Sequence, residues 1–311
     1  MGRYTLYAVN IDIAAGEGSD VLIDQITDFA LSPGIEHILR SGSGSVDPTF
    51  VGVMNQNPRA SWSTTALATV LAKCGIAGLA IAADVDELGC EMFFNNLAEG
   101  STRGGDGTNV KLSAAEGLLV PRTINAPHGG EATLSMELIP TWDGTLDPIV
   151  IATAQNLVGS PAVGELFTVG PVKINGATVT DVQNITINFG ITEIVRGGSG
   201  SVWPTFVGIM SRTPSITVVT DDVDQFNTLT LPGVAQGATN SVVYLTKMAE
   251  GSTRTANATA EHISFTIDEG HIAVTNVGGS HGAPLTAEIT ITPTYDGTDA
   301  ILVVSTATAI T

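Results

Sequence analysis

The sequence is poor in positive charge, in aromatic residues and in long apolar runs, and each shortage narrows the class of protein. It has 12 Lys and Arg against 31 Asp and Glu, for a formal net charge of −19 at pH 7. A nucleic-acid binder needs clustered basic side chains that neutralise phosphates. We therefore do not expect specific DNA or RNA binding. The acids are scattered through both halves of the chain, so no acidic tail follows a neutral domain.

The apolar segments are too short for a membrane-spanning helix. The longest, residues 76–83, falls well below the roughly 20 residues that cross a bilayer. The N-terminal residues soon reach Asp12, Glu17 and Asp20, so we expect no secretion signal. Hydrophobic residues make up 43% of the 311 residues and charged residues 14%, a composition that predicts a folded, globular protein.

The strongest feature of the sequence is an internal duplication. Three pairs of matching segments are residues 40–54 and 196–210, residues 98–103 and 249–254, and residues 140–145 and 293–298. The first pair reads RSGSGSVDPTFVGVM and RGGSGSVWPTFVGIM, with 12 of 15 residues identical at an offset of 156. The offsets of the other pairs, 151 and 153, differ slightly, as insertions and deletions in loops would cause.

We therefore predict two tandem domains, residues 1–160 and residues 161–311, with the boundary within residues 158–164. The two cysteines, Cys74 and Cys90, both lie in the first half. The second half repeats the same pattern without cysteine, so we expect free thiols, as in a chain made in a reducing cytosol.

Apolar and polar residues alternate with the period of two that is typical of half-buried antiparallel strands. Residues 185–189, 263–267 and 287–292 each place apolar side chains on one face. One short helix is expected in each half, at residues 64–73 and at residues 222–228. The second helix would begin with acids that suit the helix dipole.

Two Asp-Gly pairs predict tight turns between strands. These pairs are residues 143–144 and 296–297, and a type I′ turn favours Asp-Gly because both central residues need positive φ. We expect each turn to form a hairpin that joins the preceding strand to an apolar partner, at residues 148–153 in the first half and at residues 300–305 in the second.

The order of strand, Gly/Ser loop, strand, helix and closing strands in each half resembles the bacteriophage major tail (tail tube) protein family, here in an internally duplicated version. Residues 182–190, VQNITINFG, look like the opening strand of that family. Residues 214–220, with residues 58–64 as their counterpart, resemble the later strand that leads into a short acidic helix. Residues 128–137 are similar to the closing strands. The resemblance implies a mainly β fold with two tail-tube-like sandwich or barrel domains, each flanked by a short helix.

In that family six domains form a ring around a channel that carries DNA. The resemblance therefore implies that one duplicated chain fills two positions, that three chains form a ring with pseudo-sixfold symmetry, and that rings stack into the tail tube. The implied partners are further copies of the chain, other phage tail proteins, and DNA that passes through the lumen without specific binding. The implied location is the virion tail, with the host cytoplasm during assembly and no membrane.

General physical arguments agree with this interpretation. A β domain with open sheet edges can avoid uncontrolled aggregation if each edge pairs with the next domain until a ring closes. An acidic wall would also repel DNA and keep it from sticking during ejection. We therefore expect acids to outnumber bases in the lumen.

The best-matched loops contain the residues that we expect to make assembly contacts between domains or rings. Glycines permit backbone shapes that present apolar side chains to a neighbour, and prolines lower the cost of ordering the loop. The expected contact residues are Gly42, Ser43, Gly44, Pro48, Phe50 and Val51, and Gly198, Ser199, Gly200, Pro204, Phe206 and Val207. A phosphate-binding loop would need a lysine and a following helix, which are absent from the pattern. A plain flexible hairpin that diverged slowly is the alternative.

No pattern indicates catalysis, a cofactor or a metal site. Of the five histidines only His128 and His281 correspond between the halves, and neither has further ligands at suitable spacing. Residues 84–87 contain three acids but lack the alternating ligands of a calcium loop. The sequence contains no recurring cysteine nucleophile. We therefore expect no enzyme activity and no cofactor.

The aromatic residues suggest one further possibility, a sugar-binding platform formed by Trp62, Trp142 and Trp203. Only Trp142 has an aromatic counterpart, Tyr295, and aromatic residues make up 5% of the chain. Packing beside the Asp-Gly turn explains that pair more simply. The alternatives to a tail tube subunit are a baseplate hub, a tail adaptor or a capsid decoration protein of similar architecture, a two-domain β-sandwich binding module or adhesin, and an enzyme.

Overall fold

The computed structural model describes most of the chain. The residues outside the description are 1–2, 12–20, 82–88, 98–104, 160–163, 199, 224–235, 252, 283, 296 and 299. Most of the predicted helix at residues 222–228 and most of the predicted boundary at residues 158–164 therefore lie outside the described residues, so the division into two domains remains a prediction. The acids at residues 84–87 also lie outside them.

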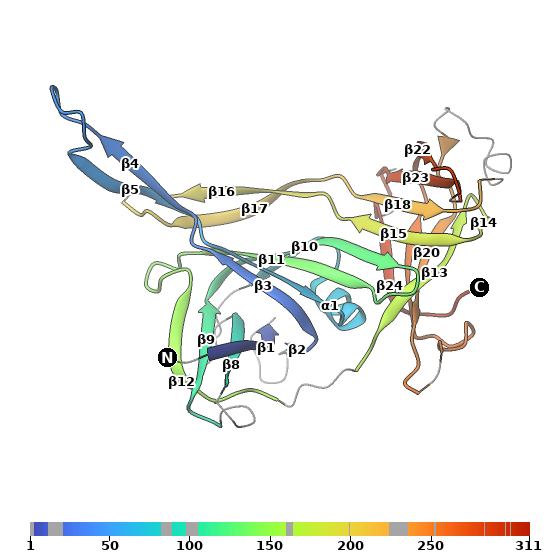
Figure 1. The fold of residues 1–311 in the computed structure, drawn as a ribbon, viewed down its shortest axis with the longest axis horizontal. Coiled ribbons are helices and arrows are strands. Elements are labelled where there is room, and N and C mark those ends of the chain that lie inside the picture. Colours follow the sequence, from blue (N-terminus) through green and yellow to red (C-terminus); the bar gives the residue numbers. More distant parts are fainter. Residues whose placement is uncertain are drawn as a thin grey trace.

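The fold is mainly β, as the alternating pattern predicted, and every strand pairing is antiparallel (Figure 1). One five-stranded sheet has the order β12 (Val150–Gln155), β9 (Asn109–Ala114), β8 (Cys90–Leu97), β1 (Arg3–Ile11) and β2 (Val21–Ile23). A second has the order β24 (Val303–Thr308), β21 (His262–Ile267), β20 (Ser241–Lys247), β13 (Phe167–Ile174) and β14 (Ala177–Val179). The two orders correspond strand by strand.

A ten-stranded sheet runs through both halves. From the first half it contains β3 (Ile26–Ser32), β6 (Arg59–Thr64), β11 (Thr133–Thr141) and β10 (Glu116–Pro127), with β7 (Leu79–Ile81) beside β10. It continues through β15 (Val182–Asn188), β18 (Ser215–Thr220), β23 (Thr286–Pro293) and β22 (Gly270–Gly278), with β19 (Gln236–Gly237) beside β22. Two groups of the same order thus meet where β10 pairs with β15, and β3 and β22 lie toward opposite ends.

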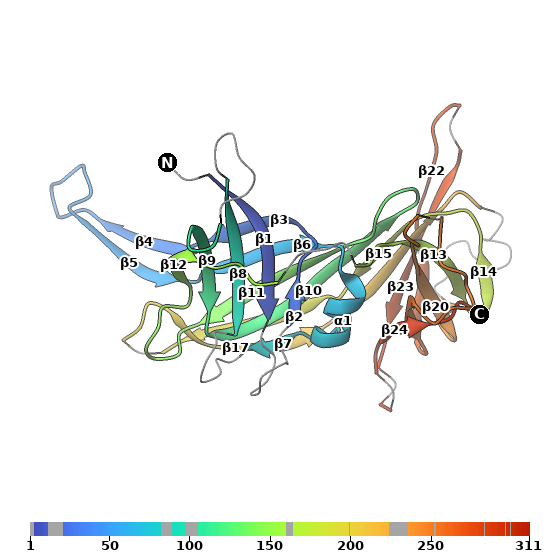
Figure 2. The same ribbon diagram turned by 90° about the horizontal axis from the view of Figure 1, so that it is seen from below.

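Two long hairpins extend from this sheet. The first, β4 (Ile35–Arg40) and β5 (Phe50–Gln56), continues β3 and β6. The second, β16 (Ile191–Gly197) and β17 (Pro204–Arg212), continues β15 and β18. Figure 2 shows β4 and β5 projecting from the body of the molecule. The glycine-rich segments that the sequence suggested were loops are therefore the tips of these hairpins.

Each hairpin begins at a glycine that cannot be replaced without strain. Gly34 and Gly190 have φ of 58° and 57°, and a Cβ on either would lie 1.9 or 2.0 Å from the carbonyl oxygen of Asn57 or Thr213. The residues that supply these carbonyls also donate to the glycines, Asn57 N to Gly34 O and Thr213 N to Gly190 O, each at 3.0 Å. Left-handed φ and this close approach both require glycine.

The core lies between the sheets. Alternate residues of β15, Ile185 and Ile187, are fully buried, whereas Thr186 between them faces away from the core. The outward face of the ten-stranded sheet carries mainly small polar side chains, among them Ser61, Ser63, Thr133, Ser135, Thr186, Asn188, Ser215, Thr217 and Thr290. This alternation is what the period of two predicted.

The one helix of the described residues is α1 (Leu67–Cys74), which confirms the prediction at residues 64–73 with a later start. The start is later because Thr64 ends strand β6 and its hydroxyl donates to Gln25 O at 2.8 Å. Glu165 accepts a hydrogen bond from Thr69 N at 3.0 Å, so a carboxylate from the second half satisfies the helix N-terminus. Cys74 and Cys90 are free thiols and are buried.

The prediction of Asp-Gly hairpins was wrong. Strand β11 pairs with β10 and β6, whereas β12, which follows Asp143 and Gly144, pairs with β9 in the other sheet. The segment is therefore a connection between layers. Asp143 lacks the positive φ of a type I′ turn, and its Oδ1 accepts from Thr145 N at 2.7 Å and Leu146 N at 2.6 Å. In the second half, β24 likewise pairs with β21 and not with β23.

Candidate assembly interface

The joint between the two halves begins with the pairing of β10 and β15. Ile124 lies opposite Ile187, and Ala126 lies opposite Ile185. All four side chains are fully buried. Backbone hydrogen bonds extend the ladder at both ends, from Phe189 N to Arg122 O at 3.1 Å and from His128 N to Gln183 O at 2.7 Å.

The β16–β17 hairpin forms the second part of the joint. It lies across the outward face of β10 and β11 (Figure 1). Trp142 N donates to Pro204 O, and Gln56 N donates to Val202 O, both at 2.8 Å. Ile191 is 7% exposed, and the side chains of Val195 and Val207, which pair across the hairpin, pack against the core. The second half thus adds both a strand and a hairpin to the first.

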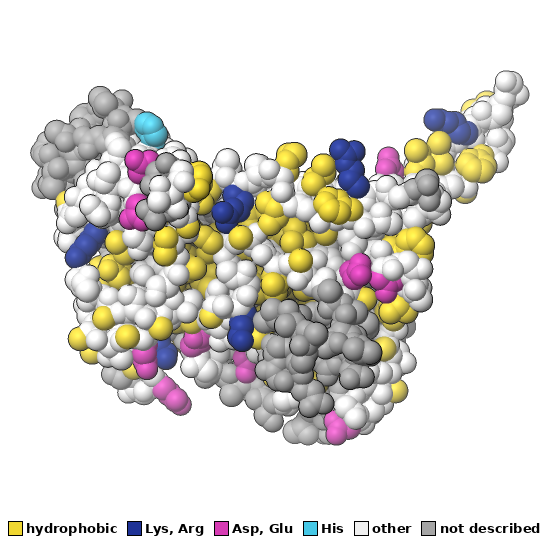
Figure 3. All heavy atoms as spheres, turned by 180° about the vertical axis from the view of Figure 1, so that it is seen from behind, with side chains coloured by type: hydrophobic (Ala, Val, Ile, Leu, Met, Phe, Trp, Pro, Cys, Tyr) yellow, Lys and Arg dark blue, Asp and Glu magenta, His cyan; other side chains and the backbone are white. Residues whose placement is uncertain are grey.

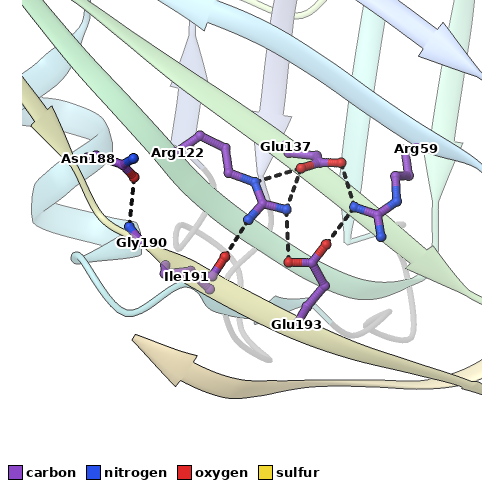
Figure 4. Close-up of polar contacts among 7 residues, drawn as sticks. All are labelled: Arg59, Arg122, Glu137, Asn188, Gly190, Ile191 and Glu193. Atoms are coloured by element: carbon purple, nitrogen blue, oxygen red, sulfur yellow. Dashed lines mark hydrogen bonds and ion pairs between the residues drawn. The ribbon is translucent and has the colours of Figure 1, made fainter. Parts of the chain in front are cut away.

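Four charged side chains form a cluster of ion pairs across the joint (Figure 4). Glu193 of β16 accepts from Arg59 of β6 through Oε1 at 2.6 Å and lies 3.0 Å from Nη2 of Arg122 through Oε2. Glu137 of β11 bonds to both arginines, at 2.8 Å from Arg59 Nη1 and 2.6 Å from Arg122 Nε. Arg122 Nη1 also donates to Ile191 O at 2.8 Å. Each carboxylate therefore bridges both guanidinium groups.

The charges of this cluster support one another. Burial alone would raise the pKa of Glu193, but hydrogen bonds from Arg59 and Arg122 outweigh it and hold the pKa of this carboxyl below its ordinary value. Burial alone would likewise lower the pKa of Arg59, and the bonds to Glu137 and Glu193 raise it above its ordinary value. The charged forms are thus favoured on both sides of the joint.

None of these four charges recurs at the matching position of the other half. Register shifts in the strand ladders show which residues of the two halves correspond. Strands β10 and β22 shift register at Arg122 and at Thr275, so these two residues match. Strands β16 and β4 shift register at Glu193 and at His37, so these two also match. By the same pairing Arg59 and Glu137 correspond to Ser215 and Thr290. Hydroxyls cluster there instead, with Thr275 Oγ1 at 3.3 Å from Thr290 Oγ1, and Thr275 Oγ1 also donates to the carboxylate of Glu288 at 3.1 Å.

Side chains that the joint buries are exposed at the matching positions. Ile124 of β10 is fully buried, whereas Val277 of β22 is 49% exposed. In the hairpins, Ile191 is 7% exposed, but Ile35 is 45% exposed. Leu39 and Val51, which pair across β4 and β5 as Val195 and Val207 do across β16 and β17, are 56% and 65% exposed. Figure 3 shows hydrophobic side chains along the projecting hairpin.

The twelve predicted contact residues are thus split between two environments. In the first half Gly42, Ser43, Gly44, Pro48, Phe50 and Val51 are all exposed, at or near the tip of the projecting hairpin. In the second half Pro204 is buried and its carbonyl binds Trp142, Val207 is half-buried, and Phe206 is 54% exposed. Gly198 and Gly200 lie at the tip of the second hairpin, and Ser199 lies outside the described residues. Their role in assembly remains a prediction.

Sequence reasoning missed the charged cluster of Arg59, Arg122, Glu137 and Glu193. Similarity between the halves does not indicate these residues, because they lie where the halves differ. Oppositely charged residues in one half that align with Ser, Thr and His in the other would have been the available signal.

The described part of the chain contains no group of three or more His, Cys, Asp and Glu side chains that could hold a metal ion. His262 is buried and accepts from Lys247 N through Nδ1 at 3.1 Å, a structural role. Trp62 is 1% exposed, so it cannot form an exposed platform with Trp142 and Trp203. Within the described ranges no helix has the length and apolar character needed to span a membrane.

In comparisons with known proteins, no family model matches the chain, and no curated protein matches its sequence.

Proposed function

We propose that this chain is a structural subunit that associates head to tail with further copies into rings, and that stacked rings form the tube of a phage tail. The observation that carries the proposal is the internal joint. One of its sides, β10 and β11, has a matching exposed surface at β22 and β23, and the other side, β15 and β16–β17, has one at β3 and β4–β5. Within the described residues, each chain therefore presents both sides of its own joint without a partner, toward opposite ends.

A heterologous contact of this kind repeats until the rotation closes a ring or continues as a filament. The internal joint sets the rotation between successive halves, so outer joints of the same geometry give a ring in which every chain fills two positions. Three chains are the expected number for a pseudo-sixfold ring. The sheet edges at β3 and β22 also favour assembly, because long unpaired edges are rarely left open in stable soluble proteins.

The composition of the outward sheet face supports a role as a conduit. Its small hydroxyl and amide side chains offer few charges to which DNA could bind, and the net charge of −19 makes the chain repel phosphate at long range. A smooth, weakly binding wall suits passage of DNA better than retention.

Electron microscopy of the purified protein tests the proposal. The expected result is long hollow tubes, and native mass measurement of a single ring should give three copies of the 31.9 kDa chain. Six copies per ring would contradict the three-chain arrangement. Isolated rings that never stack would favour a baseplate hub or a tail adaptor, and a monomer at all concentrations would reject the proposed function.

A further inference from the structure

We propose that β3 and the β4–β5 hairpin of one copy dock on β22 and β23 of a second copy in the register of the internal joint. This inference rests on the proposed function, and it specifies which residues meet. The occupant of the exposed surface is a second copy of this chain, because the internal joint already shows matching strands and a matching hairpin in the docked state.

The register follows from the ladder shifts. In the internal joint Asn125 lies opposite Thr186, and the corresponding residues are Gly278 of β22 and Ala30 of β3. Val277 would lie opposite Leu31, as Ile124 lies opposite Ile187. Both strands are accessible for this pairing, since Ala30 is exposed and β3 has β6 as its only strand partner among the described residues. On the described part of β22, β19 pairs only with His271 and Ile272, far from Gly278.

The hairpin contacts follow from the same correspondence. Trp142 N donates to Pro204 O within the chain, so Tyr295 N of one copy would donate to Pro48 O of the next. Tyr295 is 65% exposed in the single chain, so its surface is open to a neighbouring hairpin. The contact of Gln56 N with Val202 O predicts a bond from Arg212 N to Val46 O, and Val46 is 98% exposed. The projecting hairpin would then lie on its neighbour as β16–β17 lies on the first half.

The proposed contact between two copies, which we call the outer joint, would be weaker than the internal joint. Its polar centre would contain His37 from one copy and Ser215, Thr275 and Thr290 from the other, in place of the four charges of the internal joint. It would also lack one backbone hydrogen bond, because Pro33 occupies the position of Phe189 and has no N–H to donate. Each chain would therefore fold as a unit first and join its neighbours reversibly.

Cysteine cross-linking tests the register. Asn125 and Thr186 form a non-hydrogen-bonded pair, since Phe189 N binds Arg122 O and pairs alternate along the ladder, so Ala30→Cys and Gly278→Cys would lie within disulfide range. A Cβ at Gly278 would meet only Asn276 Nδ2, at 4.0 Å. Burial raises the pKa of the native Cys74 thiol to about 12, and Cys90 is also buried, so neither competes under mild oxidation.

A mixture of the Ala30→Cys chain and the Gly278→Cys chain should give a covalent dimer, and neither chain should do so alone. A chain with both substitutions should close into covalent rings. The register control pairs Ser32→Cys with Gly278→Cys. Ser32 lies two residues along β3 from the position opposite Gly278, so the two cysteines would be diagonal neighbours about 7–8 Å apart. This separation should slow cross-linking about tenfold or more. Equal rates for both pairs, or dimers of Ala30→Cys alone, would overturn the proposed docking.

The hairpin contact has its own matched pair of variants. Val51 of β5 and Ile151 of β12 are each 65% exposed, but only Val51 lies in the proposed contact. Val51→Asp should raise the protein concentration needed for assembly about tenfold or more, because docking would bury the carboxylate, whereas Ile151→Asp should leave it unchanged. Normal assembly of Val51→Asp would overturn the inference.

These outcomes separate the inference from the proposed function. Tubes that form without the Ala30–Gly278 cross-link would reject this docking and leave the tube function standing. Cross-linked rings from a protein that never forms tubes would support this docking and reject the tube.

Discussion

Glu193 Oε2 lies 3.0 Å from Arg122 Nη2, and this ion pair connects β16 of the second half to β10 of the first. The same carboxylate binds Arg59 through its other oxygen at 2.6 Å. A single side chain from the second half therefore holds two cations of the first half. The position that matches Glu193 is His37, on the β4–β5 hairpin.

Glu193→Gln should destabilise the fold, because the amide keeps the shape of the side chain but cannot offset two arginines. We expect a loss of about 1–2 kcal/mol in the free energy of unfolding, since the cluster is partly exposed. Urea unfolding measures it. The control is Glu261→Gln, which removes a more exposed pair with Lys247 at 3.3 Å and should cost less than about 0.5 kcal/mol. Equal losses in both variants would contradict a special role for Glu193.

The stability that Glu193 contributes should depend on pH in a defined direction. Its pKa in the folded protein is below the ordinary value of 4.5, so the folded state favours the charged form. The contribution is fully present above about pH 4.5 and is lost as pH falls through the folded pKa. The difference in unfolding free energy between wild type and Glu193→Gln should therefore be constant near neutral pH and shrink in acid. A difference that grows in acid would reverse the assignment.

Charges transferred from the internal joint should strengthen the proposed outer joint. Thr275→Arg and His37→Glu would recreate the pair of Arg122 and Glu193 between two copies. A mixture of the two single variants should associate about tenfold more tightly than either variant alone, measured by sedimentation. A double-mutant cycle isolates the coupling of the two substitutions. Absence of coupling would mean that these residues do not meet.

Positive charge on the outward face of the ten-stranded sheet should hinder DNA passage. Ser61→Lys, Ser135→Lys and Thr217→Lys place three cations on that face without changing the core. If this face lines the lumen, tubes should still assemble, and DNA ejection should slow in low salt and recover in high salt. Ejection at the normal rate would place the lumen elsewhere, and a lumen lined mainly by Arg and Lys would remove the electrostatic argument.

The strands were predictable where one face of the strand is buried and the other is exposed to solvent. Residues 185–189 and 263–267 alternate, and both segments form strands apart from Phe189, because period-two patterning reflects burial on one face. The Asp-Gly segment at residues 143–144 misled the prediction. An Asp-Gly pair specifies a local reversal of the chain, but the partner strand is chosen by long-range packing, which placed β12 beside β9.

The candidate interface was only partly visible in the sequence. The repeated segments at residues 40–54 and 196–210 indicated a shared constraint, but their high glycine content suggested loops and concealed two long hairpins. Exposed hairpin strands lack the alternating burial that reveals a strand in a sequence. The exposure of Val277 and the burial of Ile124 could not be predicted, since both are aliphatic residues at matching strand positions and, of the two strands, β15 pairs with the one that carries Ile124.

Deletion of both hairpin tips should separate folding from assembly. The tip at residues 42–45 makes only local bonds, such as Gly42 N to Thr49 Oγ1 at 2.9 Å and Ser45 N to Gly42 O at 3.0 Å. In the second tip, residues 198–201, the contact of Pro204 O with Trp142 N lies outside the deleted segment. Removing both segments should therefore lower the unfolding temperature by less than about 4 °C.

The doubly deleted protein should stay soluble and no longer form tubes, because the two tips would present Phe50 and Phe206 to neighbouring domains or rings. These phenylalanines are 58% and 54% exposed in the single chain, so assembly is the step that can bury them. The single deletion of residues 42–45 tests the first hairpin alone, since these residues form hydrogen bonds with no other element in the described part of the chain. It should already prevent assembly if the first hairpin makes the contact between copies. Normal tubes from the double deletion, viewed by electron microscopy, would show that neither tip is needed.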